Sequence, residues 1–191
     1  MSTSARDGYH HGDLRAALLR SATEMLEAGE PFSLRAVAKR AGVSATAPYR
    51  HYADKDALES ALATEGFRDL GERLAGAGGL AELGVAYVAF ALERPALFQL
   101  MFGNPCDDAD DPRVRAATEI RRFVKRVIAT TYPEADAAAL ATAGWALVHG
   151  LAFLHLDGKL PAGDPAEVAD RVRTSMAAIL TAGRESPAGG G

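Results

Sequence analysis

Apolar residues recur at three- and four-residue intervals along most of the chain, which is the spacing that places them on one face of an α-helix. Such stripes cover residues 14–26, 114–128 and 168–180 most clearly. Helix-forming residues dominate the composition and β-branched residues are sparse, which favours helices over strands. The pattern therefore predicts an all-α fold.

Two short helical patterns joined by a tight turn lie within SLRAVAKRAGVSATAPYRHYADK, residues 33–55. Ser33 suits the N-cap of the first, and Gly42 ends it in a left-handed conformation that lets the chain turn sharply. Ser44 then caps the second helix, in which Pro48 falls at the fourth position and deletes only the first intrahelical bond. The stretch predicts a helix-turn-helix motif, in which two helices meet at a sharp angle.

The charge of this stretch differs from that of the chain as a whole. The protein has a formal net charge of -4. Residues 33–53 nevertheless carry four cations and no acidic residue. Because a local positive face attracts phosphate, the motif is predicted to read DNA. The cations are Arg35, Lys39, Arg40 and Arg50.

The glycine run 76–79 breaks a long helical pattern and is the best candidate for a domain boundary. We expect an N-terminal arm and DNA-binding unit over residues 1–53 and a connecting helix over 54–75. A C-terminal domain then covers 76–183, and a disordered tail follows at 184–191.

The segment 137–156 is apolar nearly all round and long enough to span a membrane. It is alanine-rich, contains Thr142, His149 and His155, and lacks flanking basic or aromatic anchors. We therefore predict a buried core helix that also meets a second subunit.

Several kinds of chemistry find no support in the residues. Cys106 is the only cysteine, which excludes a disulfide framework and a multi-thiolate metal site. The acidic loop 103–112 lacks the residue spacing of a calcium-binding loop. The sequence shows no pairing of a nucleophile with a general base. The first eleven residues have no apolar signal region. We expect no metal, no cofactor, no enzyme activity and a cytoplasmic location.

The stretch LRAVAKRAGVSATAPYRHYADKDAL resembles the helix-turn-helix and following helix of the tetracycline-repressor (TetR) family of transcriptional regulators. The resemblance covers about residues 9–67. Further on, Trp145, His149 and Gly150 resemble the tryptophan-histidine-glycine C-terminal module of some of these regulators. The resemblance implies an N-terminal three-helix DNA-binding domain and a C-terminal helical domain that dimerises and binds a small-molecule effector.

Residues at the motif are expected to contact double-stranded DNA. Thr46 is the main base-facing candidate, whereas Tyr49, His51 and Lys55 suit phosphate oxygens, as their counterparts in the family do. The full expected set is Ser33, Arg35, Lys39, Ser44, Ala45, Thr46, Ala47, Pro48, Tyr49, His51 and Lys55.

The C-terminal domain supplies candidates for a largely apolar effector pocket and for a dimer interface. A role purely in the core is about as good an interpretation for each pocket residue. The pocket candidates are Tyr87, Phe90, Phe98, Met101, Phe102, Phe123, Trp145, His149 and Phe153. The interface candidates are Leu147, Leu151, Leu154, Val168, Val172, Met176 and Ile179, on two long helices that would form a four-helix interface.

These features together predict a ligand-responsive repressor. A homodimer would read a palindromic operator with half-sites about 34–36 Å apart. The alternatives are a helical protein-interaction module or a helical enzyme in which the helix-turn-helix is vestigial.

Overall fold

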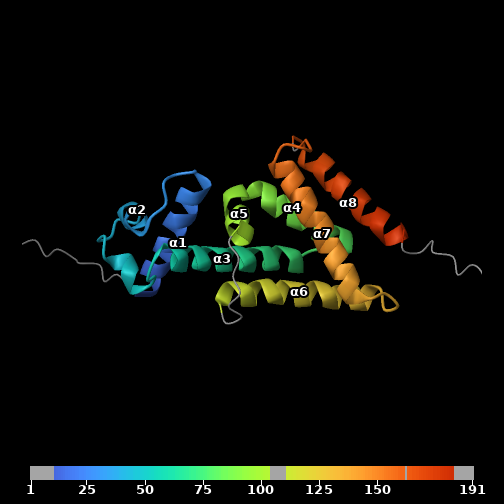
Figure 1. The fold of residues 1–191 in the computed structure, drawn as a ribbon, viewed down its shortest axis with the longest axis horizontal. Coiled ribbons are helices and arrows are strands. Elements are labelled where there is room, and N and C mark those ends of the chain that lie inside the picture. The colour runs from blue at the N-terminus through green and yellow to red at the C-terminus, as the bar shows by residue number, and fades with distance from the viewer. Residues whose placement is uncertain (1–10, 104–110, 162, 183–191) are drawn as a thin grey trace, which may run out of the picture. The chain divides into compact units, whose positions relative to one another are not determined.

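The computed structural model describes residues 11–103, 111–161 and 163–182, and every regular element among them is helical (Figure 1). The all-α prediction is therefore confirmed. The arm expected over residues 1–8, most of the acidic loop and the tail at 184–191 lie outside the described residues. The elements are α1 (His11–Glu27), α2 (Leu34–Arg40), the 3-10 helix η1 (Ala47–Arg50), α3 (Lys55–Ala75), α4 (Leu80–Glu93), α5 (Pro95–Gly103), α6 (Pro112–Thr131), α7 (Ala137–Leu156) and α8 (Pro165–Ala182).

The N-terminal unit, Met1–Ala63, is built where the apolar stripes of α1 and α2 meet the start of α3. Leu18 of α1, Val37 of α2 and Leu58 of α3 are completely buried. Burial of one such side chain contributes about 1.5–3 kcal/mol. These contacts, more than helix propensity, hold the seven-residue α2 in place, because so short a helix is unstable alone.

The turn after α2 has the geometry that the sequence predicts. Ser33 accepts a hydrogen bond from the Ala36 amide at 3.1 Å through its Oγ and so caps the helix. Gly42 has φ +71°. The amide of Val43 donates to the Ala38 carbonyl at 3.0 Å, and that of Gly42 donates to the Lys39 carbonyl at 3.2 Å. This pair of bonds is a Schellman motif, which ends a helix on a left-handed residue.

The helix predicted to start at Ser44 is absent, and the prediction is corrected to a single 3-10 turn, η1. The cause is Pro48, whose ring nitrogen cannot donate to the Ser44 carbonyl as an α-helix would require. The Ala47 amide donates a hydrogen bond to the Ser44 carbonyl instead, at 3.0 Å. Ser44 is not a helix cap: its Oγ lies 3.3 Å from Thr46 Oγ1.

The connecting helix α3 runs through the division between the two compact units. Asp54 caps it by accepting from the Ala57 amide at 2.8 Å. The division between the compact units falls between Ala63 and Thr64, inside the helix and ahead of the glycine run at which a domain boundary was predicted. The reason is that the later turns of α3 bury Phe67, Leu70 and Leu74 in the C-terminal unit, Thr64–Gly191.

In the C-terminal unit, α4 is the most enclosed helix. No residue from Leu80 to Leu92 is exposed, and α7, α8 and α5 pack around it. Gly84 allows the closest approach, because a Cβ there would lie 3.1 Å from Cγ1 of both Val148 and Val172. The core of this unit is therefore organised around α4.

Helix α7 was predicted to be a core helix that also meets a second subunit, and within the subunit only one of its faces is core. By length and composition it could cross a membrane, yet only 17% of its apolar window is buried inside the chain. Val148, Leu151 and Ala152 face inward, whereas Leu154 is 44% exposed. One face of α7 is thus core, and the opposite apolar face is left uncovered by the residues that the structure describes.

Four residues predicted for the dimer interface are buried inside the subunit and are corrected to core positions. The inward stripe of α8 packs against α4, so its apolar side chains are not available to a partner. Of the remaining candidates, Leu154 is exposed, and Leu147 and Ile179 are partly exposed. The four core residues are Leu151, Val168, Val172 and Met176.

We predict that Gly84→Val lowers the free energy of unfolding by about 2 kcal/mol, because the added methyl groups overpack the junction of α4 with α7 and α8. Gly71→Ala is the matched control: a Cβ there meets Ile120 at an ordinary 3.5 Å. It should raise stability by up to about 1 kcal/mol through helix propensity. Denaturant unfolding measures both. Equal stability of the Gly84→Val variant and the wild type would contradict the packing described.

Candidate nucleic-acid interface and apolar cavity

Most side chains predicted to contact DNA are exposed in the N-terminal unit. The structure leaves the three residues before η1, Ser44, Ala45 and Thr46, open to solvent. Ala47 is half-buried, and Pro48 is fully buried, so Pro48 is corrected from a contact to a core residue. The other exposed members of the set are Ser33, Arg35, Lys39, Tyr49, His51 and Lys55.

A shallow hollow brings the start of α2, η1 and the start of α3 together. Tyr49, 51% exposed, stands on its wall with Arg35 and Lys55. The ammonium group of Lys55 lies 2.8 Å from Glu59 and 5.8 Å from the centre of the Phe32 ring. Hydroxyl, guanidinium and ammonium donors around one hollow suit an oxygen-rich anion such as a backbone phosphate.

The basic strip is weaker than the sequence suggested. Arg40 donates to both carboxylate oxygens of Glu30 at 2.8 Å and lies 3.3 Å from Glu24. Both acidic residues come from outside the stretch whose charges were counted. Arg40 therefore orients the end of α2 against α1 and its loop, and it is not a free cation.

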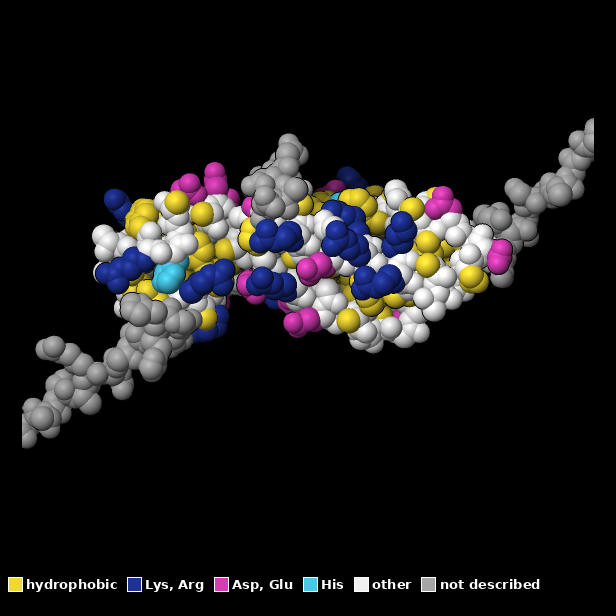
Figure 2. All heavy atoms as spheres, turned by 90° about the horizontal axis from the view of Figure 1, so that it is seen from below, with side chains coloured by type: hydrophobic (Ala, Val, Ile, Leu, Met, Phe, Trp, Pro, Cys, Tyr) yellow, Lys and Arg dark blue, Asp and Glu magenta, His cyan; other side chains and the backbone are white. Residues whose placement is uncertain are grey.

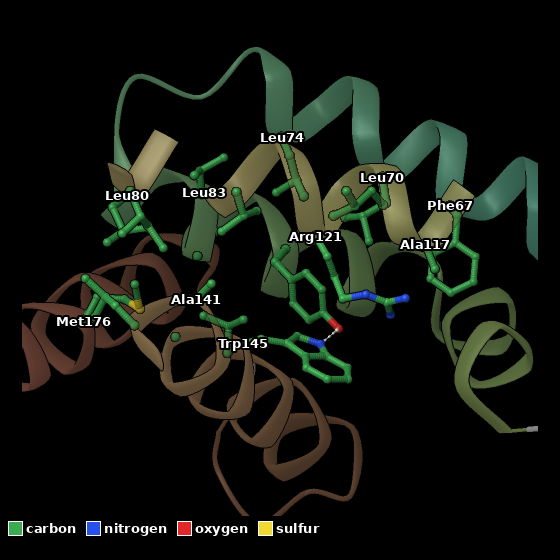
Figure 3. A pocket seen from close by; sticks show the side chains of 18 of the residues that line it. Phe67, Leu70, Leu74, Leu80, Leu83, Ala117, Arg121, Ala141, Trp145 and Met176 are labelled. Atoms are coloured by element: carbon green, nitrogen blue, oxygen red, sulfur yellow. Dashed lines mark hydrogen bonds between the residues drawn. The ribbon is translucent and has the colours of Figure 1, made fainter. Parts of the chain in front are cut away.

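The C-terminal unit encloses a second feature, an apolar cavity of about 100 Å³ (Figure 3). Six helices contribute to its wall, most of it from α3, α4, α6 and α7, and Arg121 is the one charged residue in it. The lining residues are Phe67, Leu70 and Leu74 of α3; Leu80, Leu83, Gly84 and Tyr87 of α4; Phe102 of α5; Ala117, Ile120, Arg121, Val124 and Ile128 of α6; Leu140, Ala141, Gly144, Trp145 and Val148 of α7; and Met176 of α8.

Three of the nine predicted pocket residues, Tyr87, Phe102 and Trp145, line this cavity. Phe98 is completely buried and sits within 6.4 Å, ring centre to ring centre, of five other aromatic rings, so it is core. The structure also places the other five outside the wall: Phe90 and Met101 are core, and Phe123, His149 and Phe153 are partly buried.

A hydrogen-bonded group adjoins the cavity. The Tyr87 hydroxyl lies 2.9 Å from Nδ1 of His149, and Trp145 Nε1 donates to the same hydroxyl at 3.3 Å. Burial lowers the pKa of His149, which favours the neutral ring, and burial raises the pKa of Tyr87. Tyr87 is therefore protonated and can donate to His149 while accepting from Trp145.

Positive charge gathers on α6, where Figure 2 shows Lys and Arg side chains over the exposed surface of the helix. Six basic residues and one acidic residue lie between positions 112 and 131. Arg121, Arg122, Lys125 and Arg126 are all exposed, and only Arg121 also lines the cavity.

Most of the wall consists of aliphatic residues, which a prediction from aromatic residues and methionines does not include. The signal that could have found the others is the apolar stripe of each helix. Ala117, Ile120 and Val124 of α6 share one face, and that face lines the cavity. Leu70 and Leu74 likewise lie on the buried face of α3 and line the cavity.

A helix-turn-helix with an exposed polar face, followed by a helical unit around an apolar cavity, is the arrangement of a DNA-binding transcriptional regulator. Comparison with known families agrees. Residues 18–62 match the family described as bacterial regulatory proteins, tetR family, and residues 80–179 match the tetracyclin repressor-like C-terminal domain. The chain belongs to the tetracycline-repressor (TetR) family.

Individual proteins and solved structures are also similar to this chain. An uncharacterised helix-turn-helix transcriptional regulator of Haemophilus influenzae is 30% identical over 121 residues, covering 58% of this chain and 59% of that protein. A protein of unknown function from Rhodococcus sp. RHA1 is 33% identical with TM-score 0.75, covering 90% of this chain and 97% of that one. A TetR-family regulator from Streptomyces coelicolor, 20% identical, shares the fold with TM-score 0.73 over 91% and 83% of the two chains.

We predict that the protein loses stability as pH falls below 6.5, the ordinary pKa of histidine. Burial lowers the pKa of His149 and, with help from Arg171, that of His155. Because the unfolded chain then binds protons more readily than the folded one, acid favours unfolding. Denaturant unfolding at pH 7.5 and 5.5 measures the loss.

His149→Gln should reduce this loss because it removes one of the two titrating groups. Tyr87→Phe should instead lower stability by about 1 kcal/mol at both pH values, since it removes the hydroxyl but keeps the buried imidazole. A pH dependence unchanged in His149→Gln would contradict the assignment.

Proposed function

We propose that this regulator is a ligand-responsive repressor that binds a palindromic operator as a homodimer in the cytoplasm. The observation that carries the proposal is the pairing, in one chain, of an exposed helix-turn-helix face with an apolar cavity. A protein that only bound DNA would have no need of the cavity. A protein that only bound a ligand would have no need of the exposed donors around Tyr49 and Lys55.

The DNA contact is proposed to divide between base reading and phosphate binding. Thr46 is the exposed residue before η1 best able both to hydrogen-bond a base and to offer a methyl group to thymine. Arg35, Tyr49 and Lys55 surround the hollow and suit phosphate. With so few base-reading side chains, sequence-dependent DNA shape would contribute much of the specificity.

Dimerisation is proposed to use the uncovered face of α7 together with α8. The exposed face of α7 carries Ala139, Ala143, Ala146 and Gly150 at alternating spacings of four and three residues. Side chains this small let two helices approach closely, and burying an apolar face against a second copy is favourable. The exposed residues of α8 that share this character are Thr174, Ala177, Ala178 and Thr181.

The ligand response is proposed to pass through α3, because this helix alone contributes residues to both compact units. Its later turns supply Phe67, Leu70 and Leu74 to the cavity wall, and its first turn supplies Lys55 to the hollow. A ligand changes DNA affinity only if it binds the two forms of the dimer with different affinities.

We predict that Lys55→Ala weakens binding to the DNA upstream of the protein's own gene and lowers the slope of log K against log salt by about one. The control is Lys159→Ala, which removes an exposed lysine of the C-terminal unit. It should change neither the DNA affinity nor the salt slope. A gel shift at several salt concentrations provides the measurement. Salt-independent binding, or equal effects of the two variants, would remove the case for a phosphate contact.

We predict that Ala146→Arg gives a monomer, because a charged side chain cannot be buried in a close apolar helix pair. Ala129→Arg places the same side chain on exposed α6 and should stay dimeric. Sedimentation velocity at micromolar concentration separates the two states. If the wild type is itself a monomer, the dimer proposal fails, whatever the DNA binding shows.

A further inference from the structure

The chemistry of the cavity wall restricts the ligand more than its shape does. Apolar side chains make up nearly all of the wall, so the body of the ligand must be apolar. No acidic side chain lines the described cavity, so nothing there would neutralise a cationic ligand. The polar groups are Arg121, the Trp145 Nε1 and the Tyr87 hydroxyl.

Donors outnumber acceptors among these three groups. The guanidinium of Arg121 carries five N–H donors and the indole carries one, and neither can accept. The hydroxyl of Tyr87 already accepts from Trp145 and lies 2.9 Å from His149. A ligand that complements this wall must bring acceptors, and an anionic group brings them with the opposite charge.

Arg121 is placed to receive such a group. Its Nη2 donates to Thr118 Oγ1 at 2.9 Å, and no carboxylate among the described residues is paired with it. The residue is exposed and also lines the cavity, so solvent and the cavity both reach its side chain. Figure 3 shows Arg121 extending from α6 among the side chains that line the cavity.

The surrounding charge strengthens the same preference. Arg122 and Lys125 on the same helix are exposed, and α6 carries six basic residues against Glu119 alone. A surface of one sign beside an apolar opening raises the local concentration of anions.

The size of the cavity limits the apolar body. Its volume is about 100 Å³. An apolar cavity of about 150 Å³ holds one benzene ring. The enclosed part of the ligand is therefore no larger than a single ring or a short alkyl chain.

From these observations we infer that the cavity binds a compact hydrophobic carboxylate, with its ring or short chain among the α3, α4 and α7 side chains and its carboxylate on Arg121. Planar guanidinium and carboxylate groups can form two parallel hydrogen bonds, which accounts for arginine at this position. The inference rests on the proposed function in taking the cavity as the effector site, and it adds the chemical class.

Trp145 provides a direct test, because it is the only tryptophan of the chain and it lines the cavity. Phenylacetate and hexanoate would be titrated against its fluorescence in the full-length protein, each beside its neutral amide and with phenethylamine as the cation. We expect the carboxylates to bind about tenfold more tightly than the amides, the effect of a charge-assisted hydrogen bond partly exposed to water.

Variants locate the effect. Arg121→Gln should reduce carboxylate affinity about tenfold and leave amide affinity unchanged. Arg122→Gln, at the adjacent exposed arginine outside the wall, removes an equal charge without touching the wall and should reduce carboxylate affinity much less. Arg121→Lys keeps the charge but not the two parallel hydrogen bonds. Its carboxylate affinity should lie between those of the wild type and Arg121→Gln. Unchanged thermal unfolding of the variants would show that they are folded.

The result that overturns the inference is equal binding of acid and amide, binding of neither, or an equal loss in both arginine variants. The proposed function is judged separately by the gel shift with and without phenylacetate. Carboxylate binding through Arg121 with no change in DNA affinity would leave the inference standing and refute the ligand response. If phenylacetate changes the DNA affinity of the wild type and of Arg121→Gln equally, the ligand response would stand and the inference would be refuted.

Discussion

Burial of α4 is the constraint on which the C-terminal unit depends. This helix has no exposed residue before Glu93, so other helices must cover it on every side. Gly84 lets Val148 of α7 and Val172 of α8 come close on one side, and the aromatic contacts of Tyr87 with Phe98 and Phe102 hold α5 on another. The cavity forms where α4 faces α3 and α6, because the side chains there do not fill the space.

The same constraint explains the uncovered face of α7. Since α7 packs its inner face on α4 and the cavity, its outer face of alanines and Gly150 is left without a partner among the described residues. Covering an apolar face of this kind is favourable, which supports the proposed dimer. Trp145, which is 45% exposed, lines the cavity and lies beside the exposed Ala146 in the sequence.

The sequence predicted the helices well because caps and turn residues act locally. Ser33 caps its helix and Gly42 adopts the left-handed conformation, as predicted. It failed where one residue overrode a pattern, as Pro48 did in reducing a helix to a single turn.

It failed also where the outcome depends on packing between distant segments. Periodicity identifies an apolar stripe but not its partner, so Val172 and Met176 looked available for a second subunit although they pack on α4. Arg121 belonged to a run of basic residues of which only one lines the cavity, and only the three-dimensional arrangement distinguishes it from Arg122.

The central claim is that ligand binding in the C-terminal cavity and DNA binding by the N-terminal unit are coupled. Coupling is reciprocal, so the most direct test is to titrate phenylacetate against Trp145 fluorescence with and without saturating operator DNA. The account predicts weaker ligand binding to the DNA complex, by the same factor by which the ligand weakens DNA binding. An identical dissociation constant in both titrations would contradict it.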